Sequence, residues 1–87
     1  MLIHIGGDTV VSSEDVIAIF DVGAKDKPAT KSFLDHEQHA GRVEVVDVGD
    51  VKSFVVTNRT VYFSPISSLT LRKRAYVVEM NGRPEIE

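Results

Sequence analysis

The chain has 87 residues, no cysteine, 43% apolar residues and a net charge of −3 at neutral pH. This length allows one small domain, and the missing cysteines exclude disulfides, thiolate metal sites and a thiol nucleophile. No apolar run approaches the roughly 20 residues needed to cross a bilayer, and MLIHIGGD lacks the features of a secretory signal, so we expect a cytoplasmic protein without membrane contact.

The first third of the chain predicts strands. Short β-rich runs at 2–5 and 9–11 flank Gly6-Gly7-Asp8, which indicates a hairpin because glycine supplies the positive φ angles of tight turns. Residues 12–15 form either a turn or one helical turn capped by Ser12 or Ser13. The apolar run 16–20 predicts a strand covered on both faces. A connector rich in glycine, aspartate and lysine follows at 21–28.

A helix of about three turns is predicted between Pro28 and Gly41, since proline favours helix starts and glycine favours helix ends. Its apolar face is thin and consists of Ala29, Phe33, Leu34 and Ala40. One side of this helix should pack, and the rest should face water.

The second half predicts three more strands and a helix. The strands are 43–47, 53–57 and 60–64, the last two joined by a tight turn at Asn58-Arg59. After Pro65, Ser67 or Ser68 can cap a helix that begins near Leu69. Its inward stripe is Leu71, Ala75 and Val78. The helix should extend through Ala75, and 76–78 fit either more helix or another strand.

These elements predict an α+β fold, a small bent antiparallel sheet of five or six short strands with two short helices. We expect a single domain at 1–80 and a flexible tail at 81–87. Several strands are apolar on both faces, and open strand edges promote association, so we expect a homo-oligomer. The alternative is a monomer whose sheet curls on itself.

Charge is distributed unevenly along the chain. Residues 1–51 hold four basic and ten acidic residues, a net charge of −6, and the last nine carry −2. Residues 52–78 contain no acid and carry +5, from Lys52, Arg59, Arg72, Lys73 and Arg74. Such a basic zone indicates an anionic partner, or a neighbouring subunit that presents the acidic half.

The five cations are our candidate DNA-binding residues. On a helix, residues 72–74 lie about 100° apart and fan out instead of forming one stripe. One subunit should therefore bind double-stranded DNA weakly, whereas a symmetric ring would repeat the set along the duplex. The competing interpretation is that residues 72–74 form ion pairs between subunits.

Catalytic and metal-binding patterns are weak. His36 and His39 share a helix face, but no third ligand stands at a known spacing, so we expect a solvated face and neither metal nor cofactor. His4 should be a partly buried, hydrogen-bonded histidine. No serine lies in a G-x-S-x-G context, and the adjacent Glu14 and Asp15 point apart. We predict no catalytic residues and no enzyme.

Three sequence blocks carry a family resemblance: IHIGGDTVVS at 3–12, IAIFD at 17–21, and SFVVT at 53–57 leading to YFSPISSLTLRKRA at 62–75. Together they resemble the RemB (YaaB) extracellular matrix regulatory protein family of bacteria, which is related to the RemA regulators. The resemblance covers nearly the whole chain. It implies a small bacterial regulator of matrix genes that assembles into a homo-oligomeric ring and contacts promoter DNA.

The resemblance also bears on individual residues. RemA-type proteins hold DNA with an arginine just after the second strand and an arginine pair before the Val-Val strand. In this chain the first position is Asp15, and the pair is Asp50 and Val51. Because an acid repels the phosphate backbone, we expect no DNA binding through the RemA surface, and binding through the five cations instead.

The sequence therefore predicts a non-enzymatic bacterial regulator of extracellular matrix (biofilm) gene expression, a homo-oligomer that binds DNA through its basic segment. The alternative is a protein-interaction module that regulates by binding a partner protein or a related ring without touching DNA.

Overall fold

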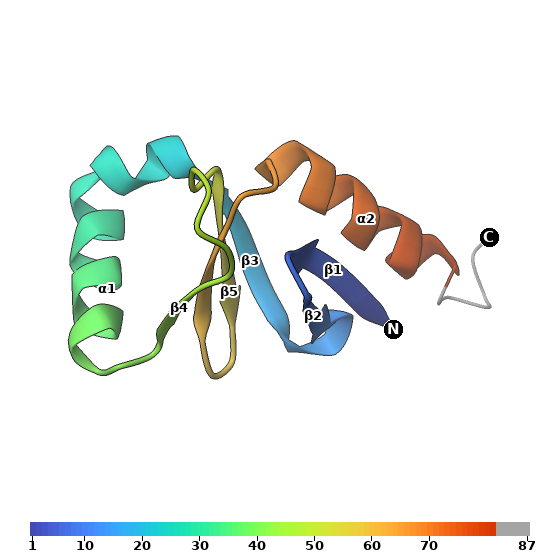
Figure 1. Cartoon of the computed structure of the whole chain (residues 1–87), viewed down its shortest axis with the longest axis horizontal. Helices are drawn as coiled ribbons and strands as arrows, with labels where there is room; N and C mark the ends of the chain where they lie inside the picture. Colours follow the sequence, from blue (N-terminus) through green and yellow to red (C-terminus); the bar gives the residue numbers. More distant parts are fainter. Residues whose placement is uncertain (82–87) are drawn as a thin grey trace.

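A computed structural model of the chain describes the backbone of residues 1–81 and the side chains of residues 1–75. The strands are β1 (Leu2–Gly6), β2 (Thr9–Ser12), β3 (Val16–Asp21), β4 (Val43–Val45), β5 (Ser53–Thr57) and β6 (Val61–Ser64). The helices are α1 (Pro28–His39) and α2 (Ser68–Asn81), with short 3₁₀ turns η1 (Ser13–Asp15) and η2 (Val22–Asp26). The predicted α+β fold is confirmed (Figure 1).

The strands are divided between two sheets, where the sequence predicted one bent sheet. β1 and β2 form an antiparallel hairpin, and the larger sheet has the order β3-β5-β6-β4. Its pairs are antiparallel except β4 with β6, which is parallel. The separation arises at η1, where Ser12 accepts a hydrogen bond from the Glu14 N–H and the chain turns away from the hairpin.

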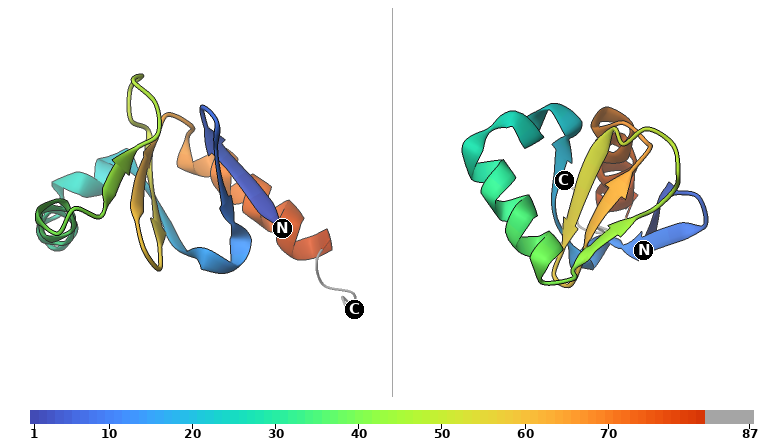
Figure 2. Two further views of the ribbon diagram at one scale, coloured as in Figure 1. Left: turned by 60° about the horizontal axis from the view of Figure 1, so that its bottom comes forward. Right: turned by 60° about the vertical axis from the view of Figure 1, so that its left-hand side comes forward.

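Each face of the large sheet has its own cover (Figure 2). On one face, α1 contributes Leu34 to a buried cluster with Phe54, Val56 and Val61. The hairpin and α2 cover the other face with a cluster of Ile3, Ile5, Val11, Val55 and Leu71. Successive residues of β5 enter opposite clusters because side chains alternate across a strand. The central strand β5 is therefore buried on both sides.

Two buried serines join the hairpin and the start of α2 to the large sheet. Ser53 and Ser64 are register partners on β5 and β6, and both are fully buried. The Ser64 hydroxyl donates to the Ile5 carbonyl at 2.6 Å and accepts from the Ile66 N–H at 3.0 Å. The Ser53 hydroxyl donates to the Ile66 carbonyl at 2.7 Å. These contacts satisfy backbone groups that burial would otherwise leave unpaired.

Glycine is required where the hairpin approaches the segment before α2. Gly6 has a φ of +123°, which disfavours any residue with a side chain. A Cβ at this position would also lie only 2.9 Å from Cδ of Pro65. The hairpin can therefore pack this closely only with glycine at position 6.

The structure corrects two expectations about burial. β3 is not covered on both faces along its length, since Ile17 is 67% exposed and Phe20 is 40% exposed. It is also an edge strand, which pairs only with β5. In α1 fewer residues of the predicted apolar face are buried than expected, since Leu34 alone is buried. The other three members of that face, Ala29, Phe33 and Ala40, are exposed.

α2 settles the alternative left open at 76–78, because the helix continues through Asn81. Its start agrees with the sequence, since the Ser67 hydroxyl accepts from the Thr70 N–H at 3.2 Å. Leu71 is fully buried, and Ala75 packs against the same cluster. The side chain of Val78 and the expected tail beyond Asn81 lie outside the described residues. No helix in the described part of the chain is long and apolar enough to span a bilayer.

Candidate nucleic-acid interface

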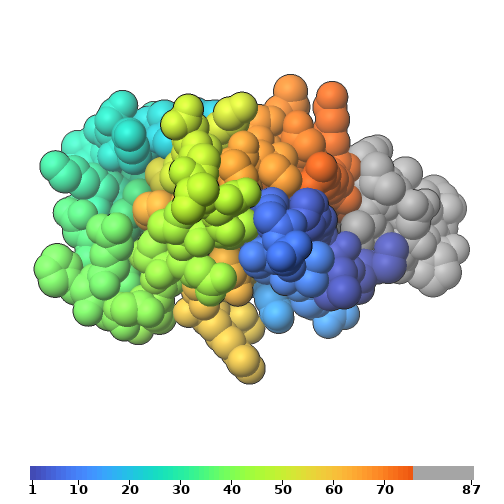
Figure 3. All heavy atoms as spheres, viewed as in Figure 1, coloured from blue at the N-terminus to red at the C-terminus, as the bar shows by residue number. Residues whose placement is uncertain are grey.

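The five candidate cations do not form one patch. Lys52 immediately precedes β5, and Arg59 lies in the turn just beyond its other end. A five-residue strand spans about 17 Å, so these two cations are held at opposite ends of the sheet. The turn that carries Arg59 forms a tip that projects from the molecule (Figure 3).

Lys52 lies at the end of the sheet where α2 begins. Its backbone N–H donates to the carbonyl of Ser64, the last residue of β6, at 2.8 Å. Four residues after Ser64 the chain enters α2, which carries the exposed side chains of Arg72 and Lys73. Lys52 therefore lies at the end of the sheet from which the chain enters α2, the helix that carries two more of the five cations (Figure 1).

Two of the helix arginines contact backbone carbonyls of this chain. Arg74, which is half-buried, donates from Nη1 to the His4 carbonyl on β1 at 2.7 Å. Arg72 is exposed, and its Nη2 lies 3.4 Å from the Ile19 carbonyl, a long hydrogen bond. Arg74 thus anchors α2 to the hairpin, whereas Arg72 is only loosely held. Sequence reasoning missed the role of Arg74, since its partner lies 70 residues away.

Ion pairing among the described residues does not occupy these cations. Among the described residues, the ion pair joins Glu37 to Arg42 at the C-terminal end of α1, and His36 Nε2 lies 4.0 Å from Oε2 of the same glutamate. Arg42 grips Glu37 with two hydrogen bonds, Nε to Oε1 at 2.9 Å and Nη2 to Oε2 at 3.0 Å. This side-chain hydrogen bonding with Arg42 lowers the pKa of Glu37 below its usual value. The acidic first half therefore does not neutralise the basic segment through ion pairs inside the described part of one subunit.

The family model for RemA-like proteins, described as extracellular matrix regulatory protein A-like, matches residues 2–75. This chain belongs to the RemA-like family. It is also 45% identical over 75 residues to extracellular matrix regulatory protein B of Bacillus subtilis (strain 168), an alignment that covers 86% of this chain and 90% of that protein. The resemblance seen in the sequence is thereby confirmed.

Asp15 is the first of the three positions that the resemblance to RemA implied for DNA contact. It belongs to η1, and its carbonyl accepts from the Asn58 N–H at 3.2 Å, beside the β5–β6 turn. Asp15 and Arg59 line the same polar hollow of about 360 Å³. In this RemA-like chain an acid therefore stands close to the only candidate cation at this end of the sheet.

The other two positions lie at the opposite end of β5. Asp50 is exposed in the loop before the strand, where its carboxylate adds negative charge beside Lys52. Val51 is half-buried and packs against the cluster under α1. Neither residue presents a cation, so this chain has no positive charge at any of the three positions.

The histidines do not assemble a metal site within the described residues, where no three potential ligands gather. His39 Nδ1 lies 2.8 Å from the Asp35 carbonyl, a helical backbone contact. His4 is hydrogen-bonded as expected, with Nε2 2.7 Å from the Gly7 carbonyl, but it is exposed and not partly buried. Its side chain points outward because β1 alternates, with Ile3 and Ile5 in the core.

Tyr62 and Phe63 are neighbours on β6 and face opposite sides of the sheet, because side chains alternate along a strand. Tyr62 packs against the cluster under the hairpin, and Phe63 packs against the cluster under α1. Phe63 forms a tilted aromatic pair with Phe54, with ring centroids 4.9 Å apart. Both rings thus contribute to the packing of the sheet.

Proposed function

We propose that this protein is a non-enzymatic regulator of extracellular matrix gene expression that binds double-stranded DNA as a homo-oligomer. Family membership and the name of the Bacillus relative, an extracellular matrix regulatory protein, support the regulatory role. The observation that carries the DNA proposal is the exposure of three cations: Lys52, at the end of the sheet from which the chain enters α2, and Arg72 and Lys73 on α2 itself. Phosphate contacts of this kind bind DNA without reading its sequence.

Association into an oligomer is the second part of the proposal. Exposed apolar side chains lie on edge strands of the described structure, including Ile17 on β3, Val45 on β4 and Val10 on β2. Exposed edges that carry apolar side chains favour pairing with another chain. Three cations per subunit bind DNA weakly, but a closed assembly repeats them and increases the affinity through multivalency.

Salt-dependent DNA binding tests the proposal. Fluorescence anisotropy with a labelled duplex at about 50 mM and about 200 mM salt should show affinity that falls steeply with salt, because each phosphate contact contributes about −0.9 to the log–log slope. Arg72→Glu should weaken binding and reduce that slope. Lys27→Glu is the matched control, since it makes the same change of charge at an exposed lysine outside the basic segment.

The assembly state separates this proposal from the alternative. Light scattering should give a mass that is a multiple of 9.6 kDa, and Arg72→Glu should leave that mass unchanged. Absence of DNA binding at about 50 mM salt, where phosphate contacts are strongest, would remove the DNA proposal. A monomer at working concentration would remove the argument from multivalency.

The alternative function is a protein-interaction module that binds a partner protein or a related ring. The observation that favours it is the negative charge of Asp15 and Asp50, two of the three positions implied for DNA contact. A partner with basic residues would complement these acids. In this case Arg72→Glu should disrupt assembly or partner capture, and the wild-type protein should leave DNA unbound.

A further inference from the structure

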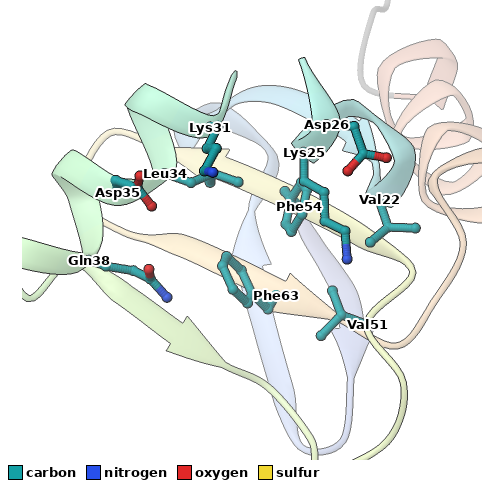
Figure 4. A pocket seen from close by; sticks show the side chains of 10 residues that line it. All are labelled: Val22, Lys25, Asp26, Lys31, Leu34, Asp35, Gln38, Val51, Phe54 and Phe63. Atoms are coloured by element: carbon teal, nitrogen blue, oxygen red, sulfur yellow. The ribbon is translucent and has the colours of Figure 1, made fainter. Parts of the chain in front are cut away.

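A cleft separates α1 from the face of the large sheet (Figure 4). Its volume is about 480 Å³, within the range of roughly 300–1,000 Å³ that small-molecule sites occupy. It exists because α1 buries only Leu34 in its 12 residues, so the helix rests on the sheet at one point instead of along its length. None of the five candidate cations lines it.

The floor of the cleft is apolar and aromatic. Phe54 and Phe63 lie side by side with centroids 4.9 Å apart, and Val51 and Leu34 flank them. Such a surface suits a flat ring, because aromatic groups pack favourably in offset or tilted arrangements.

The rim of the cleft is polar. Lys25, from η2, reaches down beside the floor, and its ammonium ends near Val51 in Figure 4. Gln38 extends from α1 toward Phe63 on the other side. Among the described residues, Lys25 has no carboxylate within ion-pair distance. Lys25 is exposed, and its ammonium at the edge of the aromatic floor can donate a charge-assisted hydrogen bond to a ligand that carries one negative charge.

The remaining rim charges limit the charge of the ligand. Lys31, Asp26 and Asp35 also line the cleft, so its lysines and aspartates balance to zero. A multiply charged phosphate would meet two carboxylates and gain little. A rim of zero net charge does not itself select an anion, so the preference for a monoanion rests on Lys25 and the preference for an apolar body rests on the aromatic floor.

We propose that the cleft under α1 binds a small aromatic monocarboxylate. The ring lies on Phe54 and Phe63, and the carboxylate accepts a hydrogen bond from the Lys25 ammonium. This inference does not depend on DNA binding, because no candidate DNA-binding residue lines the cleft.

Naphthoate is a suitable probe, with naphthalenemethanol as its neutral counterpart and naphthylmethylammonium as its cationic one. For ligands of this size we expect a Kd on the order of 1 mM, measured by saturation-transfer difference NMR on the wild-type assembly. Naphthoate should bind more tightly than either counterpart. Lys25→Gln should weaken naphthoate about tenfold and leave the neutral probe unchanged.

Lys27→Gln is the matched control, because Lys27 is two residues away, is exposed and does not line the cleft. It should leave naphthoate binding unchanged. Gln38→Trp fills the cleft from the α1 side and should abolish binding of both naphthoate and naphthalenemethanol, with circular dichroism to verify that the variant is folded.

Three results would overturn the proposal. One is the absence of naphthoate binding at about ten times the expected Kd. Another is a failure of either charge control, seen as equal binding of the anionic and cationic probes or as an equal effect of Lys25→Gln and Lys27→Gln. The third is burial of the cleft in the wild-type assembly, visible as protection of Lys25 from acetylation that is lost on dilution to the monomer, which would show that a second copy of the chain fills the cleft.

Discussion

The Ser64 hydroxyl should be the most costly small group to remove from this fold. It satisfies the carbonyl of Ile5, a residue only 1% exposed that lies at the β1 bulge without a register partner in β2. Loss of a partner by a buried carbonyl costs about 1–3 kcal/mol, and loss of the bond from the half-buried Ile66 N–H adds about 1 kcal/mol. Ser64→Ala should therefore lower the free energy of unfolding by about 2–4 kcal/mol.

Urea denaturation followed by circular dichroism, at one fixed protein concentration, measures this change. For a chain of this size the corresponding fall in Tm is about 10–25 °C. Two controls bracket the effect. Ser53→Ala removes a single hydrogen bond, to the Ile66 carbonyl, and should cost about 1–2 kcal/mol. Ser32→Ala, on the exposed side of α1, should stay within about 0.5 kcal/mol of the wild type.

The result that refutes the reasoning is a Ser64→Ala variant as stable as Ser32→Ala. In that case water would have to reach the Ile5 carbonyl, and the hairpin would not be docked on the sheet through Ser64. Since the hairpin also holds α2 through Arg74, that result would remove the basis on which α2 and its cations are positioned.

Three further predictions concern other contacts. Gly6→Ala should cost at least about 2 kcal/mol in urea denaturation, because φ is +123° and the new methyl group meets Pro65; a stable variant would contradict this. Arg42→Gln should raise the pKa of Glu37 toward its usual value in a carboxyl NMR titration. Since that pKa is lowered in the folded state, the stability due to this pair is present above the unfolded-state pKa and is lost as pH falls through the folded-state value; an unchanged titration would show that the pair does not form in solution. Leu34→Ala should cost about 2–3 kcal/mol and increase hydrogen exchange in α1 first, whereas a uniform increase across the sheet would mean that α1 does not open independently.

The choice of secondary structure was largely predictable from the sequence, because it depends on residues close together in the chain. The hairpin around Gly6, the proline at the start of α1 and the Ser67 cap of α2 each act within three or four residues. The strand periodicity also placed Tyr62 and Phe63 on opposite faces. The burial of individual side chains was less predictable. The exposure of Ile17 and Phe20 on β3 depends on which elements pack over the large sheet, and the edge position of β3 depends on the strand order.

The sequence by itself determined that residues 52–78 carry five positive charges and no acid, and it determined the family blocks. Tertiary structure decided which of those charges remain available. Arg74 is held by a carbonyl 70 residues away, and β5 separates Lys52 from Arg59. Tertiary structure also created the cleft under α1, from the helix, η2 and three loop or strand positions that are distant in sequence. One physical reason explains the Arg74 contact, the separation of Lys52 from Arg59 and the cleft. Charge and local conformation are properties of neighbouring residues, whereas hydrogen-bond partners and cavities exist only once separate elements are packed together.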